Sequence, residues 1–253
     1  MNTHFFTDTS VLLGRSMRHI FRSVDTIITT AITPIALMLL FVYVFGGAIR
    51  TDTENYVNYL LPGIMLIAIA SGIAYTAVRL FTDLQGGIFE RFQSMPIARS
   101  SVLWAHVLTS LVANGLSLVI IVGVALLMGF RTSANVLDWL AVAGILALFT
   151  LALTWIAVIA GLSAHSVEGA SAFSYPLVFL PFISSAFVPT DSMPAPVAWF
   201  AENQPVTSIV NTIRALFAQE PVGSDIWIAL AWLVGILVVA YAVAIAIYRR
   251  KVS

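Results

Sequence analysis

Residues that commonly carry chemistry are few and widely separated in this sequence. The chain has no cysteine, a single lysine (Lys251) and four histidines at His4, His19, His106 and His165. A P-loop requires a lysine directly after its glycine-rich turn, and a zinc site requires ligands at short, regular spacings. The sequence therefore predicts no catalytic residue, no metal site and no cofactor bound by this chain.

Uncharged polar residues in long apolar stretches are the remaining candidates for a binding role. No acidic or basic residue lies near the middle of these stretches, although ion-coupled carriers usually place such residues within the membrane. Most of the polar side chains are expected to form hydrogen bonds between helices, each worth about 1 kcal/mol or less. A subset is predicted to line a substrate path: Tyr75, Asn114, Ser174, Tyr175, Pro181, Ser184 and Ser185.

The composition indicates which elements position these residues. Of 253 residues, 60% are hydrophobic and 9% are charged, whereas soluble domains carry about 25% charged residues. Much of the surface must therefore face lipid. Spans of about 20 apolar residues suit a bilayer, and an all-α membrane protein with six spans is predicted: 26–47, 59–78, 106–129, 137–161, 170–189 and 226–248.

The basic residues predict the orientation of these spans. With both termini in the cytoplasm, nine of the twelve Lys and Arg residues lie inside and three lie outside, in agreement with the positive-inside rule. Residues 9–22 have an apolar face and a basic face, which is typical of an interfacial helix. The formal net charge of zero gives no indication of a nucleic-acid partner.

The connection between the second and third spans is the longest on the cytoplasmic side. Gly86 and Gly87 end the preceding helix, residues 88–95 form a short amphipathic helix, and Pro96 ends it because proline disfavours helical backbone in the residue before it. Two interpretations are open: a helix that docks a soluble partner, or an ordinary solvated connection.

Prolines divide the outer segment between the fifth and sixth spans, residues 188–225, into short pieces. The pieces at 195–201 and 206–218 are apolar but too short to span a bilayer. They are predicted to be interfacial or re-entrant helices within a segment at 195–218. Such helices form either an outer gate or a plain cap over the bundle.

These two segments resemble those of a known family. Glu90 and Arg91, followed by Pro96, Ile97 and Arg99, are similar to the E-R-x(4)-P-[IV]-x-R stretch of ABC-2 type transporter permeases. The fifth span and the outer segment after it resemble the same family's S-x-x-F-x-P and N-x-P elements. The matching residues are Ser184, Phe187, Pro189, Met193, Pro194, Asn203, Pro205 and Arg214. Within the family, the chain looks most like daunorubicin-type drug-resistance exporters, which are related to nodulation and polysaccharide exporters.

The resemblance implies a single ABC-2 transmembrane domain over residues 1–253, with the type V exporter fold, in a bacterial plasma membrane. It implies that two permease chains form a homodimer, or a heterodimer with a related permease, and that each docks a separate ATPase that binds ATP and Mg. Spans one, two and five would face the dimer axis and the substrate path, and the cargo would be a drug, an antibiotic or a lipid-like compound.

The resemblance also assigns roles to individual residues. Segment 87–99 becomes the ATPase-coupling helix, with Ile88, Glu90, Arg91, Met95, Pro96, Ile97 and Arg99. The outer gate comprises Phe187, Pro189, Asn203, Pro205 and Arg214. The alternative is a secondary carrier or channel that works without an ATPase, which the uncharged spans disfavour.

Overall fold

The computed structural model describes residues 24–46, 55–86 and 101–252. All regular secondary structure in these residues is helical. The predicted interfacial helix at 9–22 and coupling helix at 87–99 lie outside the described residues.

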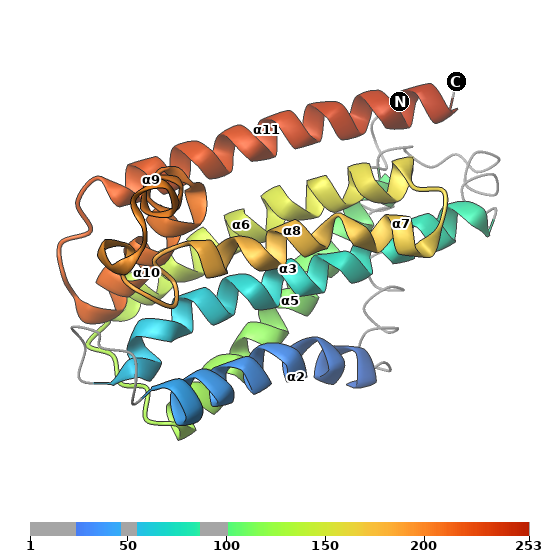
Figure 1. Ribbon diagram of the computed structural model, residues 1–253. Coiled ribbons are helices and arrows are strands. Elements are labelled where there is room, and N and C mark those ends of the chain that lie inside the picture. The colour runs from blue at the N-terminus through green and yellow to red at the C-terminus, as the bar shows by residue number, and fades with distance from the viewer. Residues whose placement is uncertain (1–23, 47–54, 87–100, 253) are drawn as a thin grey trace.

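Four of the described helices are long and apolar enough to cross a membrane. They are α3 (Tyr56–Gln85), α5 (Ser101–Leu127), α6 (Val136–Ser163) and α11 (Asp225–Val252). The first predicted span corresponds to α2 (Val24–Leu40) and the π-helical turn η1 (Phe41–Phe45), which are shorter. Helices α2, α3, α6 and α11 run in roughly the same direction through the bundle, with α2 and α11 at opposite edges (Figure 1).

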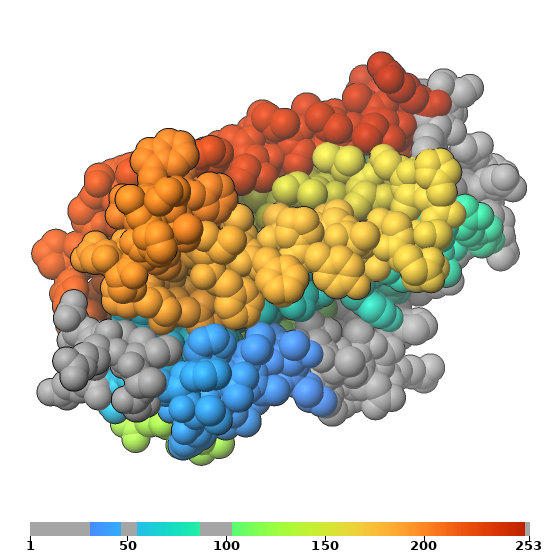
Figure 2. All heavy atoms as spheres, viewed as in Figure 1, coloured from blue at the N-terminus to red at the C-terminus, as the bar shows by residue number. Residues whose placement is uncertain are grey.

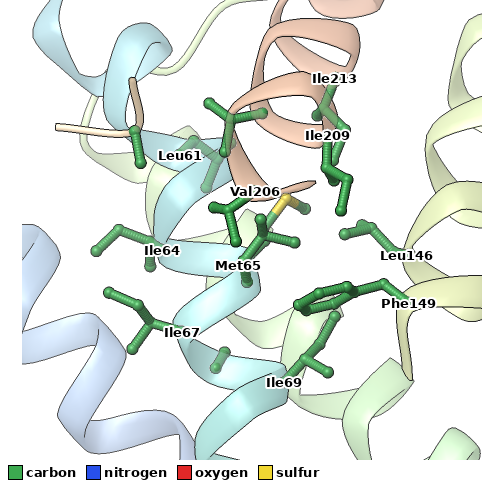
Figure 3. Close-up of a cluster of buried hydrophobic side chains, with 14 of the residues drawn as sticks. Leu61, Ile64, Met65, Ile67, Ile69, Leu146, Phe149, Val206, Ile209 and Ile213 are labelled. Carbon is green, nitrogen blue, oxygen red and sulfur yellow. The ribbon is translucent and has the colours of Figure 1, made fainter. Parts of the chain in front are cut away.

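Helix α3 lies at the centre of the bundle. It packs against α2, α5 and α6 and against two short helices, α7 (Val167–Ala172) and α8 (Ser174–Phe179), and α6 in turn packs against α11. Nearly every residue of α3 between Tyr59 and Ala70 is buried. These residues include Leu61, Ile64 and Ile67, which Figure 3 shows at the heart of the hydrophobic cluster. An apolar surface on every side explains the uninterrupted hydrophobic sequence of this helix.

The helix boundaries follow from local chemistry. Asn135 Oδ1 accepts hydrogen bonds from the backbone N–H groups of Leu137 and Asp138, and Asp138 Oδ2 accepts one from Asn135 N–H. This reciprocal capping box starts α6. Helix α3 ends at Gln85 before Gly86, as predicted, but it runs seven residues beyond the predicted end of its span at residue 78.

The fifth predicted span is not one continuous helix. It consists of α7, α8 and the 3-10 turn η2 (Leu180–Ile183), and the short 3-10 turn η3 (Thr190–Ser192) comes after it. Pro176 and Pro181 lack the backbone N–H that would continue the helical ladder. The helix stops at Ile183, and the backbone of Ser184 is extended. The predicted helical end at residue 189 was therefore wrong.

Two short helices come next along the chain, α9 (Ala195–Asn203) and α10 (Pro205–Ala218). They confirm the prediction of two helical pieces here. Pro205 occupies the first turn of α10, where a missing N–H costs nothing. Val206, Ile209 and Ile213 point from α10 towards α3 and α6 (Figure 3).

Helices α9 and α10 lie together at one end of the bundle. The start of α2, the end of α11 and α7 all lie at the opposite end (Figure 1). Figure 2 shows α2, α7, α8, α9 and α11 on the same face of the molecule.

Candidate functional site

A polar cluster lies where α10 meets α3 and the turn directly after η2. We call it the Arg214 cluster; it contains Tyr59, Ser185, Thr207, Asn211 and Arg214. Residues 207, 211 and 214 are four and three apart on α10, so their side chains share one face of that helix. This face is the polar counterpart of the apolar face that packs on α3 and α6.

Arg214 connects three elements of the fold. Its Nη2 donates to the carbonyl oxygens of Ser185 at 2.9 Å and Tyr59 at 3.1 Å, and its Nη1 donates to Asn211 Oδ1 at 3.2 Å. The guanidinium carbon lies 3.7 Å from the centroid of the Tyr59 ring, within the range of a cation–π interaction. One side chain thus links α10 to the first turns of α3 and to the turn after η2.

The charge of Arg214 is balanced by neutral groups. No carboxylate among the described residues forms an ion pair with it. Burial lowers the pKa of Arg214, while the neighbouring Tyr59 raises it; an arginine side chain still stays charged at neutral pH. The half-buried cation therefore depends on carbonyl dipoles and on an aromatic face.

The turn after η2 is held to α10 by further hydrogen bonds. Ser185 N–H donates to Thr207 Oγ1 at 3.3 Å, and Ser185 Oγ donates to Asn211 Oδ1 at 2.7 Å. Gln204 Nε2 donates to Ile183 O at 2.9 Å from the N-cap of α10. This turn is therefore fixed by side chains of α10 rather than by a helix of its own.

A cluster of aromatic side chains packs against the same turn. The Phe182 and Phe187 rings stack with centroids 4.7 Å apart and an interplanar angle of 6°, and the Phe41 ring of η1 lies 4.8 Å from that of Phe187. Tyr56 Oη donates to Phe187 O at 2.9 Å. The Phe41 ring thus joins η1, which follows α2, to the turn after η2 by apolar contact.

The structure brings together some of the predicted outer-gate residues. Arg214, Phe187 and Pro205 lie on the two elements that meet at this cluster. Pro189 and Asn203 do not contribute to it: Pro189 O accepts a hydrogen bond from Ser192, and Asn203 Nδ2 donates to Trp199 O within α9.

The predicted substrate-path residues fall in separate places. Ser184 and Ser185 are buried in the turn after η2, beside Pro181, whose carbonyl accepts from Ser184 Oγ. Tyr75 and Tyr175 are exposed at 47% and 62%. Buried Ser174 bonds to Ser171 O, and Asn114 lies in a second polar cluster.

This second group, the Ser110 cluster, joins three long helices. Thr76 Oγ1 of α3 donates to Ser110 Oγ of α5 at 3.0 Å, and Ser110 Oγ shares a hydrogen bond of 3.2 Å with Thr154 Oγ1 of α6. Asn114 Nδ2 donates to Ser110 O at 2.9 Å, while its Oδ1 is buried and has no hydrogen-bond partner among the described residues. A Cβ at Gly72 would collide with that Oδ1. The glycine therefore permits the close approach of α3 and α5.

Sequence reasoning missed several members of these clusters. Tyr59 and Asn211 were not singled out, nor were Thr76 and Ser110. For Asn211 a signal existed, because it precedes Arg214 by three residues on the polar face of a short amphipathic helix. The other three had no comparable signal, since a lone polar residue in an apolar run does not indicate its partner.

The coupling residues predicted at 88–99 lie outside the described residues, but the helix ends on either side of them are described. His106 Nε2 of α5 and Asp83 Oδ2 of α3 are 3.2 Å apart. This contact holds together the two helices that flank the predicted coupling segment.

Comparisons with known proteins can be set beside this geometry. The family model described as ABC-2 type transporter matches residues 7–218. The daunorubicin resistance ABC transporter permease protein DrrB1 of Streptomyces coeruleorubidus is 28% identical over 229 residues, covering 89% of this chain and 80% of that protein. The probable doxorubicin resistance ABC transporter permease protein DrrC of Mycobacterium tuberculosis (strain ATCC 25618 / H37Rv) is 26% identical over 253 residues, covering 98% of this chain and 90% of that protein.

Proposed function

The chain belongs to the ABC-2 type transporter family, and on that premise we propose that it is the permease subunit of an ATP-binding cassette exporter. The family match over residues 7–218 is the observation that carries this proposal. The proposed cargo is a hydrophobic or amphipathic compound, because the relatives are named for daunorubicin and doxorubicin resistance. Energy would come from ATP and Mg bound by a separate subunit.

In the proposed arrangement the chain crosses the membrane six times. The four long helices provide four spans. The other two proposed spans are α2 with η1 and the broken segment α7–α8–η2. Both are shorter than the four long helices. The excess of basic residues at one side supports cytoplasmic termini, and bacterial relatives support a bacterial plasma membrane. A dimer of permease chains completes the proposal.

The coupling role is proposed for residues 88–99, with Glu90 and Arg91 facing the ATPase. Their support is the sequence pattern together with the Asp83–His106 contact, which ties the flanking helices at their ends. A displacement of the segment between them would pass to α3 and α5 together. Helix α3 packs against more of the bundle's elements than any other described helix, so it is well placed to transmit that displacement.

The proposed outer gate is α10 with the turn after η2. Arg214 bonds both to that turn and to α3, so its hydrogen bonds must break if α10 moves away from α3. Once α10 has moved away from α3, water can hydrogen-bond to the guanidinium and to the carbonyls that it leaves. The gate can therefore close firmly and still open.

The test is co-purification of the full chain from detergent, followed by an ATPase assay of the proteins that copurify. The variants are Glu90→Lys and Arg91→Glu, and the control is charge reversal at exposed Arg249, Arg249→Glu. We expect a stoichiometric P-loop ATPase with the unaltered chain and with the control, and its loss with either coupling variant. Normal binding and normal doxorubicin efflux with both coupling variants would make the coupling assignment wrong.

The same preparation tests the whole proposal. A chain that purifies alone and moves doxorubicin into or out of liposomes without ATP would overturn the permease proposal. That outcome would favour a secondary carrier or channel. Sensitivity of that movement to an ionophore would then identify ion coupling.

A further inference from the structure

An apolar groove of about 570 Å³ runs between α5 and α6 on the outside of the bundle. Met65 of α3 forms part of its lining. Gly115 and Gly123 line the α5 side, and Ala143 and Ala147 line the α6 side. Its volume falls within the range of about 300–1,000 Å³ that is typical of sites for small organic ligands.

The groove exists because small residues face it. A Cβ built at Gly115 or at Gly123 would meet no atom within 4 Å. Neither glycine is therefore needed for close helix packing, unlike Gly72, where a Cβ collides with Asn114. These two glycines leave an open channel along α5 instead of a packed surface.

The groove lies on a flank that is suited to lipid. Val119 and Leu127 of α5 are exposed at 68% and 89%, and Leu137 and Leu140 of α6 are exposed as well. Both helices are long and apolar enough to cross a membrane. An aqueous solute would gain nothing from such a surface, whereas a hydrocarbon chain would fill it.

The groove runs along the helices and is long enough to span one leaflet. On α5 it extends from Leu111 to Leu126, a separation of 15 residues and about 22 Å at 1.5 Å per residue. On α6 it extends from Trp139 to Thr150, which is about 17 Å. Half of a hydrocarbon core is about 15 Å. The groove therefore starts near the α5–α6 turn and runs along the helices for at least the depth of one leaflet.

A cation is fixed at that end. Arg131 Nη1 donates to Phe130 O at 2.8 Å and to Leu126 O at 3.2 Å, and Leu126 is part of the groove lining. The backbone of Arg131 is held in both directions by Asn58, whose Nδ2 donates to Arg131 O and whose Oδ1 accepts from Arg131 N–H. The side chain is exposed and makes no ion pair with a described residue.

Among the described residues, no group bonds to one edge of the Arg131 guanidinium. Both hydrogens of Nη1 are used by carbonyl oxygens, whereas Nε and Nη2 make no hydrogen bond to a described residue. This edge presents two parallel N–H groups, which is the arrangement that binds phosphate in a bidentate manner. The carboxylate of Asp138, at the start of α6, accepts the N–H of Asn135 in the α6 capping box.

We propose that Arg131 and the α5–α6 groove form a binding site for a membrane phospholipid, with an acyl chain in the groove and the phosphate on the free edge of Arg131. The lipid would come from the leaflet at the α5–α6 turn, which the positive-inside rule places outside. This site does not depend on the proposed export function, since it requires only that α5 and α6 lie in a membrane.

The test is native mass spectrometry of the full chain, delipidated in detergent and titrated with dioleoyl-phosphatidylglycerol. Gly123→Leu places a side chain in the groove at a position where a Cβ meets nothing within 4 Å. Its matched control is Gly144→Leu on α6, which does not line the groove and where a Cβ also meets nothing within 4 Å. Arg131→Gln removes the phosphate contact, and its control is Arg249→Gln. Circular dichroism and thermal midpoints check that each variant is folded, and Gly115→Leu provides a second groove variant.

We expect one tightly bound lipid per chain, with binding about tenfold weaker for Arg131→Gln and for Gly123→Leu, a loss of about 1.4 kcal/mol for each. Both controls should bind as the unaltered chain does. Short-chain dihexanoyl-phosphatidylglycerol and inorganic phosphate should bind weakly, because neither fills the groove. The proposal is overturned if inorganic phosphate competes fully, if Gly123→Leu leaves lipid binding unchanged, or if it lowers the dimer fraction instead of the bound lipid.

Discussion

Replacing Arg214 with glutamine removes the charge and most of the donors from the Arg214 cluster. The variant Arg214→Gln keeps a polar side chain of similar reach but has two N–H donors instead of five. The carbonyl oxygens of Ser185 and Tyr59 lose their donor, and the Tyr59 ring loses the cation above it. Asn211 keeps its second contact, the one to Ser185 Oγ.

The magnitude can be worked out from these contacts. Two hydrogen bonds from a charged donor contribute about 1.5 kcal/mol each at the low end, and the cation–π contact contributes about 1 kcal/mol. Because Arg214 is half-buried, we halve the sum of about 4 kcal/mol to allow for solvent screening. A loss of about 2 kcal/mol corresponds to a fall of roughly 4–8 °C in the thermal midpoint for a chain of this size.

The assay for local opening uses the absence of cysteine from this chain. Ser184→Cys introduces a single thiol at a side chain that is 0% exposed. In the otherwise unaltered chain, a membrane-impermeant maleimide should not label it. With Arg214→Gln added, labelling should become measurable because the turn after η2 is no longer tied to α10. Arg214→Lys should lie between the two, since lysine keeps the charge but not the planar fork.

The matched control is Arg249→Gln, which removes an arginine from an exposed position on α11. It should change neither the thermal midpoint nor the labelling of Ser184→Cys. If Arg214→Gln behaves like Arg249→Gln in both measurements, the hydrogen bonds of Arg214 do not hold this turn. The proposed outer gate would then lose its main structural argument.

Two further predictions concern packing and orientation. Gly72→Ala should lower the free energy of unfolding by about 1–3 kcal/mol, because the new Cβ collides with Asn114 Oδ1. The double variant with Asn114→Ala should lower the thermal midpoint by less than the sum of the two single changes. Additive effects of the two changes would contradict the contact. Ser192 and Ser166 are both exposed, at opposite ends of the bundle. In intact cells, an impermeant maleimide should label Ser192→Cys at once and Ser166→Cys only after permeabilisation. The reverse labelling pattern would invert the proposed orientation.

The long helices could be predicted from sequence because their signal is local. Mainly apolar runs of 20 or more residues mark α3, α5, α6 and α11, and each prediction overlaps its helix. The fifth segment was harder. Its prolines, Pro176 and Pro181, are compatible with a broken helix, but they do not indicate that the chain leaves the helix at Ile183 and forms a turn bonded to α10. That outcome depends on a helix that comes more than 20 residues later.

The candidate site was only partly predictable for a related reason. Arg214 and Phe187 were identified through a family resemblance and not from their own contacts. Two of the hydrogen-bond acceptors of Arg214 are backbone carbonyls, those of Tyr59 and Ser185. Every residue type carries such a carbonyl, so no sequence pattern marks the two that Arg214 uses.

The two polar clusters differ in what it costs to separate the helices they join. Separating α3 from α5 would break the hydrogen bond from Thr76 to Ser110 and leave the buried Thr76 hydroxyl without its α5 acceptor inside an apolar bundle, where an unsatisfied polar group is costly. Separating α10 from α3 would expose the half-buried Arg214, whose donors can bond to water instead. The lower cost therefore lies at α10. If the proposed exporter opens at this end, α3, α5 and α6 stay packed together as one unit, and α10 with the turn after η2 separates from that unit.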